Sequence, residues 1–151
     1  NLNGTWYMTQ TVAKKWMVDH GGGKVVNIVA CMWKGFPALA HTGAARAAVV
    51  NLTKSLAVEW AQFKILVNSV APGIIDSSGL EQYSSDLIKE SWRRVPLKRL
   101  GTSEEIAWAV AYLASPAGDY YTGATLCIDG GHAHWGDMWP IPDPEPEPEK
   151  K

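Results

Sequence analysis

Three runs of the chain are almost entirely apolar, and longer amphipathic segments separate them. The runs cover residues 25–30, 65–70 and 124–128. Continuous hydrophobicity, as opposed to alternation, is typical of strands that helices cover on both faces of a parallel sheet. A strand, a long helix and a second strand in that order form the crossover unit of such a sheet. The pattern therefore predicts three adjacent parallel strands in an α/β fold.

The longest amphipathic segment runs from Thr42 to about Gln62 and predicts a long helix. Thr42 is a good candidate for the N-cap, because its hydroxyl can accept a hydrogen bond from a first-turn amide. Apolar residues recur at three- and four-residue steps, which places them on one helical face. They are Ala45, Val49, Leu52, Leu56 and Trp60.

Two further helices are predicted from their ends. Residues 2–17 have helical periodicity and stop at a run of three glycines, 21–23. A dinucleotide-binding loop follows a strand and opens a helix, whereas these glycines close a helix, so we interpret them as a cap and linker. Thr102 and Glu105 have the spacing of a capping box, which predicts a helix that stops before Pro116.

The segment between residues 72 and 100 is rich in turn residues, and its residues 86–94 predict a short helix. Loops of this size at the carboxyl end of a sheet commonly close over substrate. The alternative interpretation is a surface loop that has no binding role. Residues 137–151 alternate proline with glutamate, which favours an extended solvated tail. We therefore divide the chain into a folded portion, 1–136, and this tail.

Composition narrows the class of protein. A chain of 151 residues with 46% hydrophobic content can bury one core. The net charge of −1 gives no general attraction to nucleic acid or to an anionic membrane. The only cysteines, Cys31 and Cys127, lie in apolar runs and are expected to be buried reduced thiols of a cytoplasmic protein. No uninterrupted apolar stretch is long enough to span a bilayer.

Several short motifs together resemble the short-chain dehydrogenase/reductase family, and within it the peroxisomal trans-2-enoyl-CoA reductase branch and its bacterial relatives. The resemblance extends from Asn1 to about Gly131. The segment 35–47, Gly-Phe-Pro-Ala-Leu-Ala-His-Thr-Gly-Ala-Ala-Arg-Ala, is most similar to that branch. The other matching motifs are Val26-Asn27-Ile28, Arg46-Ala47-Ala48, Val67-Asn68, Pro72-Gly73, Thr122-Gly123 and Asp129-Gly130-Gly131.

The resemblance implies the C-terminal half of a Rossmann-like, doubly wound parallel sheet with flanking helices. Members of the family begin well before the position that matches Asn1, so we expect the chain to be the C-terminal portion of a longer enzyme and to be inactive by itself. The family also implies a homo-oligomer, a tetramer of the full-length protein, formed through the two helices at residues 2–17 and 42–62. Both helices carry apolar residues outside their core-facing stripe, which supports a second packing partner. These residues are Trp16, Val50 and Val58.

The family uses a catalytic tetrad of asparagine, serine, tyrosine and lysine. Only the asparagine is matched here, by Asn1. The serine position falls at about Ala30, the tyrosine at Thr42 and the lysine at Arg46. A charged neighbour cannot bring the pKa of a threonine hydroxyl near neutrality, as it can for a tyrosine phenol. Arginine is effectively never deprotonated, so it cannot relay a proton. Ordinary ketone reduction is therefore disfavoured.

Reduction of an α,β-unsaturated thioester needs less acid–base chemistry, because hydride adds to the β-carbon and negative charge moves toward the thioester oxygen. His41 or Thr42 can donate a hydrogen bond to that oxygen. The resemblance thus implies an NADP-dependent or NAD-dependent reductase of an acyl-CoA-type substrate. By position in the family, the residues that would contact the cofactor are Arg46, Pro72, Gly73, Ile75 and Ser77.

Other interpretations stay open for the same residues. His41 can be structural, Thr42 a simple cap and Arg46 a surface ion-pair partner. The whole chain can be a binding or scaffold protein that has lost catalysis, or a sugar or alcohol dehydrogenase with an unusual proton donor such as Tyr7. His132 and His134 lie close in sequence to two aspartates, but no further ligand spacing supports a metal site.

Overall fold

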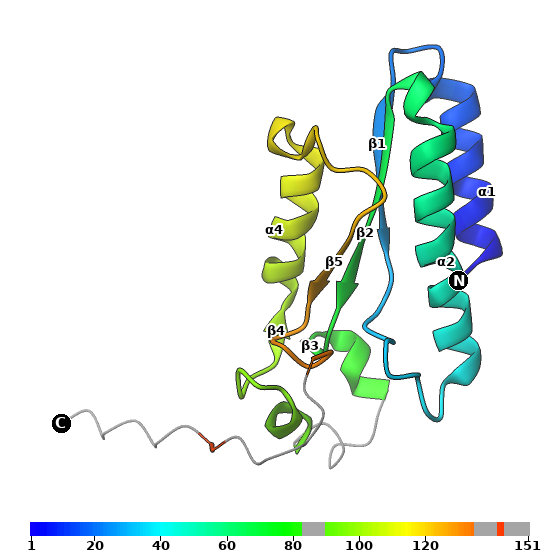
Figure 1. Cartoon of the computed structure of the whole chain (residues 1–151). Coiled ribbons are helices and arrows are strands. Elements are labelled where there is room, and N and C mark those ends of the chain that lie inside the picture. Colours follow the sequence, from blue (N-terminus) through cyan, green and yellow to red (C-terminus); the bar gives the residue numbers. More distant parts are fainter. Residues whose placement is uncertain (83–89, 135–141, 144–151) are drawn as a thin grey trace.

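A three-stranded parallel sheet forms the centre of the computed structural model, which describes residues 1–82, 90–134 and 142–143 (Figure 1). The strands are β1 (Gly23–Ile28), β2 (Ile65–Pro72) and β5 (Thr125–Ile128), in the order β1-β2-β5. Val25 pairs with Val67 on one side of β2, and Ala71 pairs with Cys127 on the other. The prediction of three adjacent parallel strands is confirmed.

Helices cover both faces of this sheet (Figure 1). On one face lie α1 (Asn3–Val12), which continues as a π-helical turn over Ala13–Met17, and α2 (Ala40–Glu59). On the other face lies α4 (Ser103–Ala114). This two-sided cover explains why the strands read as continuous apolar runs, since neither face of β2 meets water.

The core is centred on β2, the middle strand. Its side chains Ile65, Val67 and Val70 are fully buried. Leu56 of α2 packs with Ile65 and Val67, and Leu113 of α4, the helix on the opposite face of the sheet, is also buried. Fully burying an aliphatic side chain of this size stabilises the folded state by about 1.5–3 kcal/mol. The predicted core stripe of α2 is correct at Val49 and Leu56, which are both buried.

The start of α2 differs from the prediction. The helix begins at Ala40 with Leu39 as its N-cap and no side-chain capping bond, so the N-cap role predicted for Thr42 is wrong. The physical reason is that the Gly43 amide already donates to the Leu39 carbonyl, at 3.0 Å, so the N-cap lies three residues earlier than expected. The helix also ends at Glu59, and residues 61–63 form a separate 3₁₀ turn (Ala61–Phe63).

The first strand also lies earlier in the chain than predicted, so Cys31 lies outside it. It begins at Gly23, because Gly22 adopts a left-handed φ of 107° directly against the Lys64 carbonyl, and it ends at Ile28. Cys31 therefore follows β1 in a loop, while Cys127 lies within β5 as predicted. Both thiols are free and only half-buried, so the expectation of full burial is wrong.

Short elements frame the segment after β2. Strands β3 (Ile75–Asp76) and β4 (Gly101–Thr102) pair in parallel at its two ends, and 3₁₀ turns lie between and after them: Ser78–Gln82, Trp92–Arg94 and Pro116–Gly118. The predicted capping box is confirmed, with Thr102 Oγ1 accepting from the Glu105 amide and Glu105 accepting from the Thr102 amide. Of the predicted helix at 86–94, residues 90–94 are described and helical, ending in the 3₁₀ turn Trp92–Arg94, whereas residues 86–89 fall outside the described residues. Most of the tail at 137–151 also falls outside them.

Among the described helices, none combines the length and hydropathy that crossing a membrane requires.

Candidate active site

The carboxyl ends of β1, β2 and β5 meet at one end of the molecule, where α2 begins (the lower end of Figure 1). The segment between β2 and β4 lies at the same end. In parallel α/β sheets, ligands bind at this edge because the loops that follow the strands converge there. We therefore built the candidate site from the residues that follow each strand.

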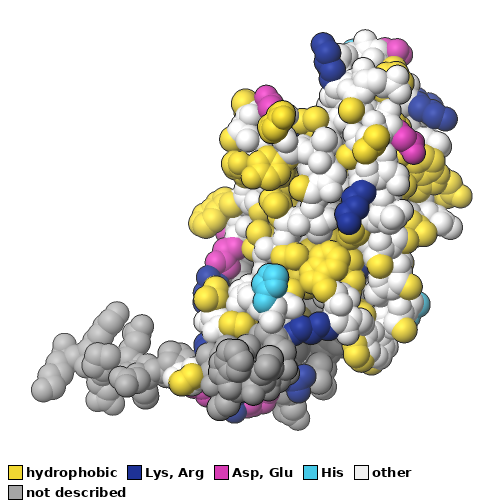
Figure 2. Space-filling model, viewed as in Figure 1, with side chains coloured by type: hydrophobic (Ala, Val, Ile, Leu, Met, Phe, Trp, Pro, Cys, Tyr) yellow, Lys and Arg dark blue, Asp and Glu magenta, His cyan; other side chains and the backbone are white. Residues whose placement is uncertain are grey.

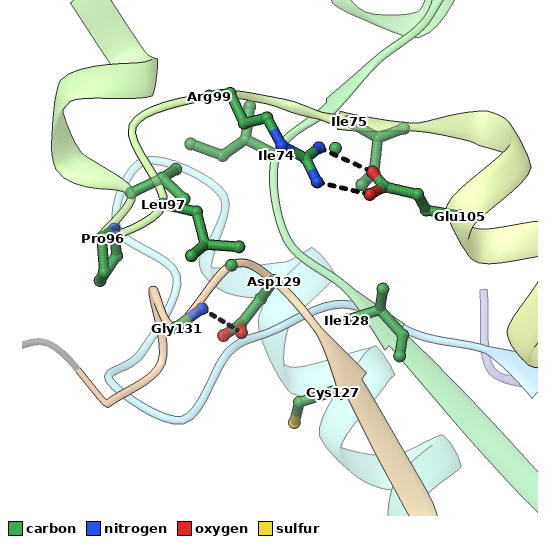
Figure 3. Close-up of a pocket in the computed structure, with 13 residues that line it drawn as sticks. Ile74, Ile75, Pro96, Leu97, Arg99, Glu105, Cys127, Ile128, Asp129 and Gly131 are labelled. Carbon is green, nitrogen blue, oxygen red and sulfur yellow. Dashed lines mark hydrogen bonds and ion pairs between the residues drawn. The ribbon is translucent and has the colours of Figure 1, made fainter. Parts of the chain in front are cut away.

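A cavity of about 500 Å³ opens at this edge (Figure 3). Its walls come from four places: the turn after β2, the loop before β4, the first turn of α4 and the end of β5. Most of the lining is aliphatic, with one ion pair and one carboxylate in the wall. The lining residues are Ile74, Ile75, Val95, Pro96, Leu97, Arg99, Gly101, Glu105, Cys127, Ile128, Asp129, Gly130 and Gly131.

The ion pair in the wall joins Arg99 to Glu105 through two parallel hydrogen bonds of 2.9 and 2.6 Å. Glu105 also accepts from the Thr102 amide at 2.9 Å. The hydrogen bond from Arg99, with that from the Thr102 amide, lowers the pKa of Glu105 to about 2. One carboxylate thus caps α4 and fixes the loop before β4 against it, which shapes that side of the cavity.

Asp129 closes the opposite wall. Its carboxylate accepts from the amides of Gly131 at 2.9 Å and Ala133 at 2.6 Å, and it points toward the turn it caps (Figure 3). Partial burial opposes the charged form, but these amide donors outweigh it and the pKa of Asp129 is lowered. The carboxylate therefore has a structural role in the turn. Within the described residues, no group of three or more His, Cys, Asp or Glu side chains could hold a metal ion.

Gly73 allows the turn after β2 to lie against the end of β5. A Cβ atom at position 73 would come within 2.7 Å of the Asp129 Cα, so only glycine fits. The Gly73 amide donates to the Ile128 carbonyl at 2.9 Å. Of the four predicted cofactor contacts in this turn, Pro72 ends β2, Gly73 makes this approach and Ile75 lines the cavity, whereas Ser77 is exposed and lies outside the lining.

Arg46 reaches from α2 to the end of β1. Its Nη1 donates a hydrogen bond to the Ile28 carbonyl, which holds the guanidinium at the carboxyl edge of the sheet. Its Nε is buried and has no hydrogen-bond partner among the described residues. A buried donor without a partner is costly, but this Nε has no accessible surface, so a ribose contact would fall to the terminal nitrogens of the guanidinium. The residue thus fits the cofactor-ribose role that the resemblance implies.

His41 and Thr42 lie in the first turn of α2, His41 exposed and Thr42 half-buried. A second, apolar hollow of about 450 Å³ lies between other residues of α2 and the loop after β1, and neither His41 nor Thr42 lines it. Gly43 forms part of its floor, because the Phe36 side chain packs where a Cβ would be. The hollow is lined by Met32, Gly35, Phe36, Pro37, Ala40, Gly43, Ala44 and Ala47.

Asn1 is exposed at the start of α1, where its carbonyl accepts from the Thr5 hydroxyl at 2.7 Å. The structure gives its side chain no hydrogen bond within the described part of the chain. Tyr7, the alternative proton donor, is 61% exposed on α1. The fold therefore brings Arg46, Gly73 and Ile75 to one edge of the sheet, and it does not join Asn1 or Tyr7 to them by a described contact.

Sequence reasoning missed several residues of the main cavity. Glu105 was identified only as a cap, and Arg99, Pro96 and Leu97 were not singled out. The available signal was the spacing of Arg99 and Glu105 around the predicted helix start, which places an arginine within reach of a capping carboxylate. Nothing in the spacing alone shows that this pair would line a cavity, because Ile75 and Asp129 are far away in sequence.

The parallel sheet covered on both faces, with its site at the carboxyl edge, defines the class as a Rossmann-like α/β nucleotide-binding fold. The family model described as enoyl-(acyl carrier protein) reductase matches residues 1–133. The chain belongs to this family of short-chain dehydrogenases/reductases, whose members are NAD(P)-dependent oxidoreductases.

Curated proteins with different activities are similar in sequence to this chain. Peroxisomal 2,4-dienoyl-CoA reductase of Rattus norvegicus is 42% identical over 132 residues, 85% of this chain and 45% of that protein. 2-Dehydro-3-deoxy-D-gluconate 5-dehydrogenase of Dickeya dadantii is 34% identical over 134 residues, 87% of this chain and 53% of that protein. The chain thus spans about half the length of the curated relatives it matches.

A solved structure agrees closely in fold. A protein of Agrobacterium tumefaciens assigned as a 2-deoxy-d-gluconate 3-dehydrogenase, with bound NADP, superposes with a TM-score of 0.83 at 37% identity. The match covers 89% of this chain and 56% of that one. The family and this NADP-bound neighbour support an NAD(P) cofactor.

Proposed function

We propose that the full-length protein reduces an α,β-unsaturated, enoyl-CoA-like substrate with NADPH. The observation that carries this proposal is Arg46, which occupies the family's lysine position and whose guanidinium is held at the carboxyl edge of the sheet by its bond to the Ile28 carbonyl. Arginine can hold the ribose but cannot relay a proton. A reaction that does not form an alkoxide on the substrate suits such a site.

The chemistry would proceed as follows in the complete enzyme. NADPH, when bound, supplies a hydride to the β-carbon of the substrate. His41 or Thr42 would donate a hydrogen bond to the thioester oxygen as negative charge develops on it, assisted by the positive end of the α2 dipole. Water would supply the proton to the α-carbon, since Ala30 and Thr42 replace the family's serine and tyrosine.

The apolar hollow at the first turns of α2 has an aliphatic and aromatic lining, which suits a hydrocarbon chain. Its lining includes neither His41 nor Thr42, and helical spacing puts Thr42 on another side of α2, so the hollow supports an apolar substrate group without placing a thioester at these donors. Burying a chain this way contributes about 0.8 kcal/mol per CH₂ group. A sugar would leave its hydroxyls unpaired in the same hollow, which disfavours it there.

A sugar or alcohol dehydrogenase is the second candidate, because the gluconate-type dehydrogenases above are similar over most of the chain. It would need a proton donor that Thr42 cannot supply, and Tyr7 is exposed on α1. A scaffold without catalysis is the third.

We also propose a homo-oligomer, a tetramer, for the full-length protein. Trp16 is 60% exposed and Val58 is 80% exposed on the face formed by α1 and α2. Val50 does not contribute to this surface, because it is buried in the core. Apolar side chains also gather over α4 (Figure 2), where Trp108 and Tyr112 are exposed. Light scattering of the full-length protein should give a mass above that of the monomer.

The test of function is a comparison of substrates in the full-length protein. Crotonyl-CoA or a longer enoyl-CoA should be reduced faster than a simple ketone or a gluconate-type sugar acid, and the 151-residue chain alone should be inactive. Alanine at whichever of His41 and Thr42 donates to the thioester should lower kcat by roughly 10²–10³-fold. Faster ketone or sugar turnover would contradict the proposal, as would full enoyl-CoA activity in both alanine variants.

A further inference from the structure

The charged side chains in the wall of the main cavity, the one of about 500 Å³, already have partners within the chain (Figure 3). Arg99 and Glu105 bind each other through two hydrogen bonds, and the Thr102 amide donates a third to the same carboxylate. The Asp129 carboxylate accepts from two amides of the turn that follows it. A ligand rich in hydroxyl groups would have to compete with these bonds for its own partners.

The other side chains in this wall are apolar, apart from the Cys127 thiol, whose sulfur accepts the Trp33 indole N–H at 3.2 Å. Val95 is 3% exposed and Leu97 is 63% exposed, so the apolar lining extends from the core to the surface. A hydrocarbon chain can therefore enter from solvent and replace water against this wall. The apolar lining residues are Ile74, Ile75, Val95, Pro96, Leu97 and Ile128.

The main cavity also reaches the turn that follows β2. Ile75, one of the predicted cofactor contacts, lines it. The hollow of about 450 Å³ at α2 is lined by none of the predicted cofactor contacts. A substrate whose reacting carbon meets the cofactor near this turn would therefore extend its chain into the main cavity and not into the hollow.

We propose that the main cavity binds the hydrocarbon chain of an acyl substrate, and that Leu97 in its wall is a residue that determines specificity for chain length. A volume of about 500 Å³ lies within the range of small-molecule sites. The inference rests on the proposed function for the identity of the substrate. The binding of a hydrocarbon chain can nevertheless be measured without turnover, so the two proposals are tested separately.

The test titrates the reduced 151-residue chain with the straight-chain alcohols from 1-pentanol to 1-octanol and follows alkylation by iodoacetamide with peptide mass mapping. Cys127 lines the main cavity, so a bound chain should shield its thiol. Cys31 is also a free thiol but does not line this cavity, so its alkylation is the internal control. The alcohol concentration that gives half of the shielding should fall roughly fourfold for each added CH₂ group. Gluconate should not shield Cys127.

Two matched variants, Leu97→Asp and Ala44→Asp, locate the bound chain. Both positions are exposed, so both variants should fold, and far-UV circular dichroism checks this. Leu97→Asp places a carboxylate without a partner in the wall of the main cavity, and it should raise the half-shielding concentration of 1-octanol by roughly tenfold or more. Ala44→Asp adds the same charge to the α2 hollow and should leave that concentration unchanged.

The inference is overturned if no alcohol shields Cys127, if Cys31 is shielded equally, or if Ala44→Asp abolishes the shielding and Leu97→Asp does not. In the full-length protein, Leu97→Asp should raise the KM for decenoyl-CoA more than that for crotonyl-CoA, and an equal rise would also overturn it. Shielding without enoyl-CoA reduction would contradict the proposed function and leave the hydrocarbon site standing. Reduction without shielding would overturn the hydrocarbon site alone.

Discussion

Arg46 donates a hydrogen bond from Nη1 to the Ile28 carbonyl, and this bond ties α2 to the end of β1 while leaving the arginine Nε buried without a partner among the described residues. If the Arg46 guanidinium holds the cofactor ribose, Arg46→Ala in the full-length protein should raise the KM for the cofactor and lower kcat through misplaced hydride. Arg46→Lys should be far milder, because lysine also reaches ribose hydroxyls. Steady-state kinetics with varied NADPH measures both.

A structural role alone would give a different result for Arg46. It would lower the melting temperature of both variants without changing the cofactor KM. Thermal unfolding of the same two proteins is therefore the control, and an unchanged KM in Arg46→Ala would exclude the ribose contact.

Gly73→Ala should destabilise the chain, because the new Cβ would lie 2.7 Å from the Asp129 Cα and backbone would have to move. The expected loss is about 1–3 kcal/mol of unfolding free energy, the usual cost of overpacking. The matched control is Gly4→Ala in α1, where a Cβ meets nothing within 4 Å. This change should be neutral or stabilise by up to about 1 kcal/mol. Urea denaturation of both variants gives the comparison, and equal effects would show that the Gly73 contact relaxes freely.

The Arg99–Glu105 pair should make the melting temperature depend on pH in the acid range. The pKa of Glu105 is about 2 in the folded chain and lower than its ordinary value of 4.5. A carboxylate with a lowered folded-state pKa contributes stability that is present above the unfolded value and lost as the pH falls toward the folded value. The melting temperature of Glu105→Gln should therefore fall less than that of the wild type between pH 4.5 and 2.

The neighbouring Glu104→Gln is the control for this pH effect, since Glu104 is exposed in the same helical turn. Its acid dependence should match that of the wild type. Identical curves for all three proteins would show that the ion pair adds nothing to stability, as is common for solvent-exposed pairs.

Thr53→Val should remove a buried hydrogen bond and leave its partner unsatisfied. Thr53 is fully buried, and its hydroxyl accepts from Asn27 Nδ2 at 3.0 Å. Leaving the Asn27 amide without that acceptor should cost about 1–3 kcal/mol. The exposed Thr11→Val in α1 should stay within about 0.5 kcal/mol of the wild type. Urea midpoints at unchanged slope measure both, and a Thr53 effect as small as the Thr11 effect would contradict the expectation.

The sequence by itself determined the architecture. Continuous apolar runs at 25–30, 65–70 and 124–128 predicted parallel strands, because only strands covered on both faces lack alternation. The capping box of Thr102 and Glu105 was also readable, since both partners lie three residues apart. Motif resemblance identified the family from short segments, and it placed Arg46 and Gly73 at positions that the fold does bring to one edge of the sheet.

Only the tertiary structure decided the boundaries and the cavities. Helix α2 begins at Ala40 without a side-chain cap, because the loop before it already presents the Leu39 carbonyl to the Gly43 amide. Arg99 and Asp129 became walls of one cavity through contacts between segments far apart in the chain. Local spacing determines which hydrogen bonds form within a few residues. It does not determine which distant side chains share a volume, because packing of the whole sheet and its helices decides that.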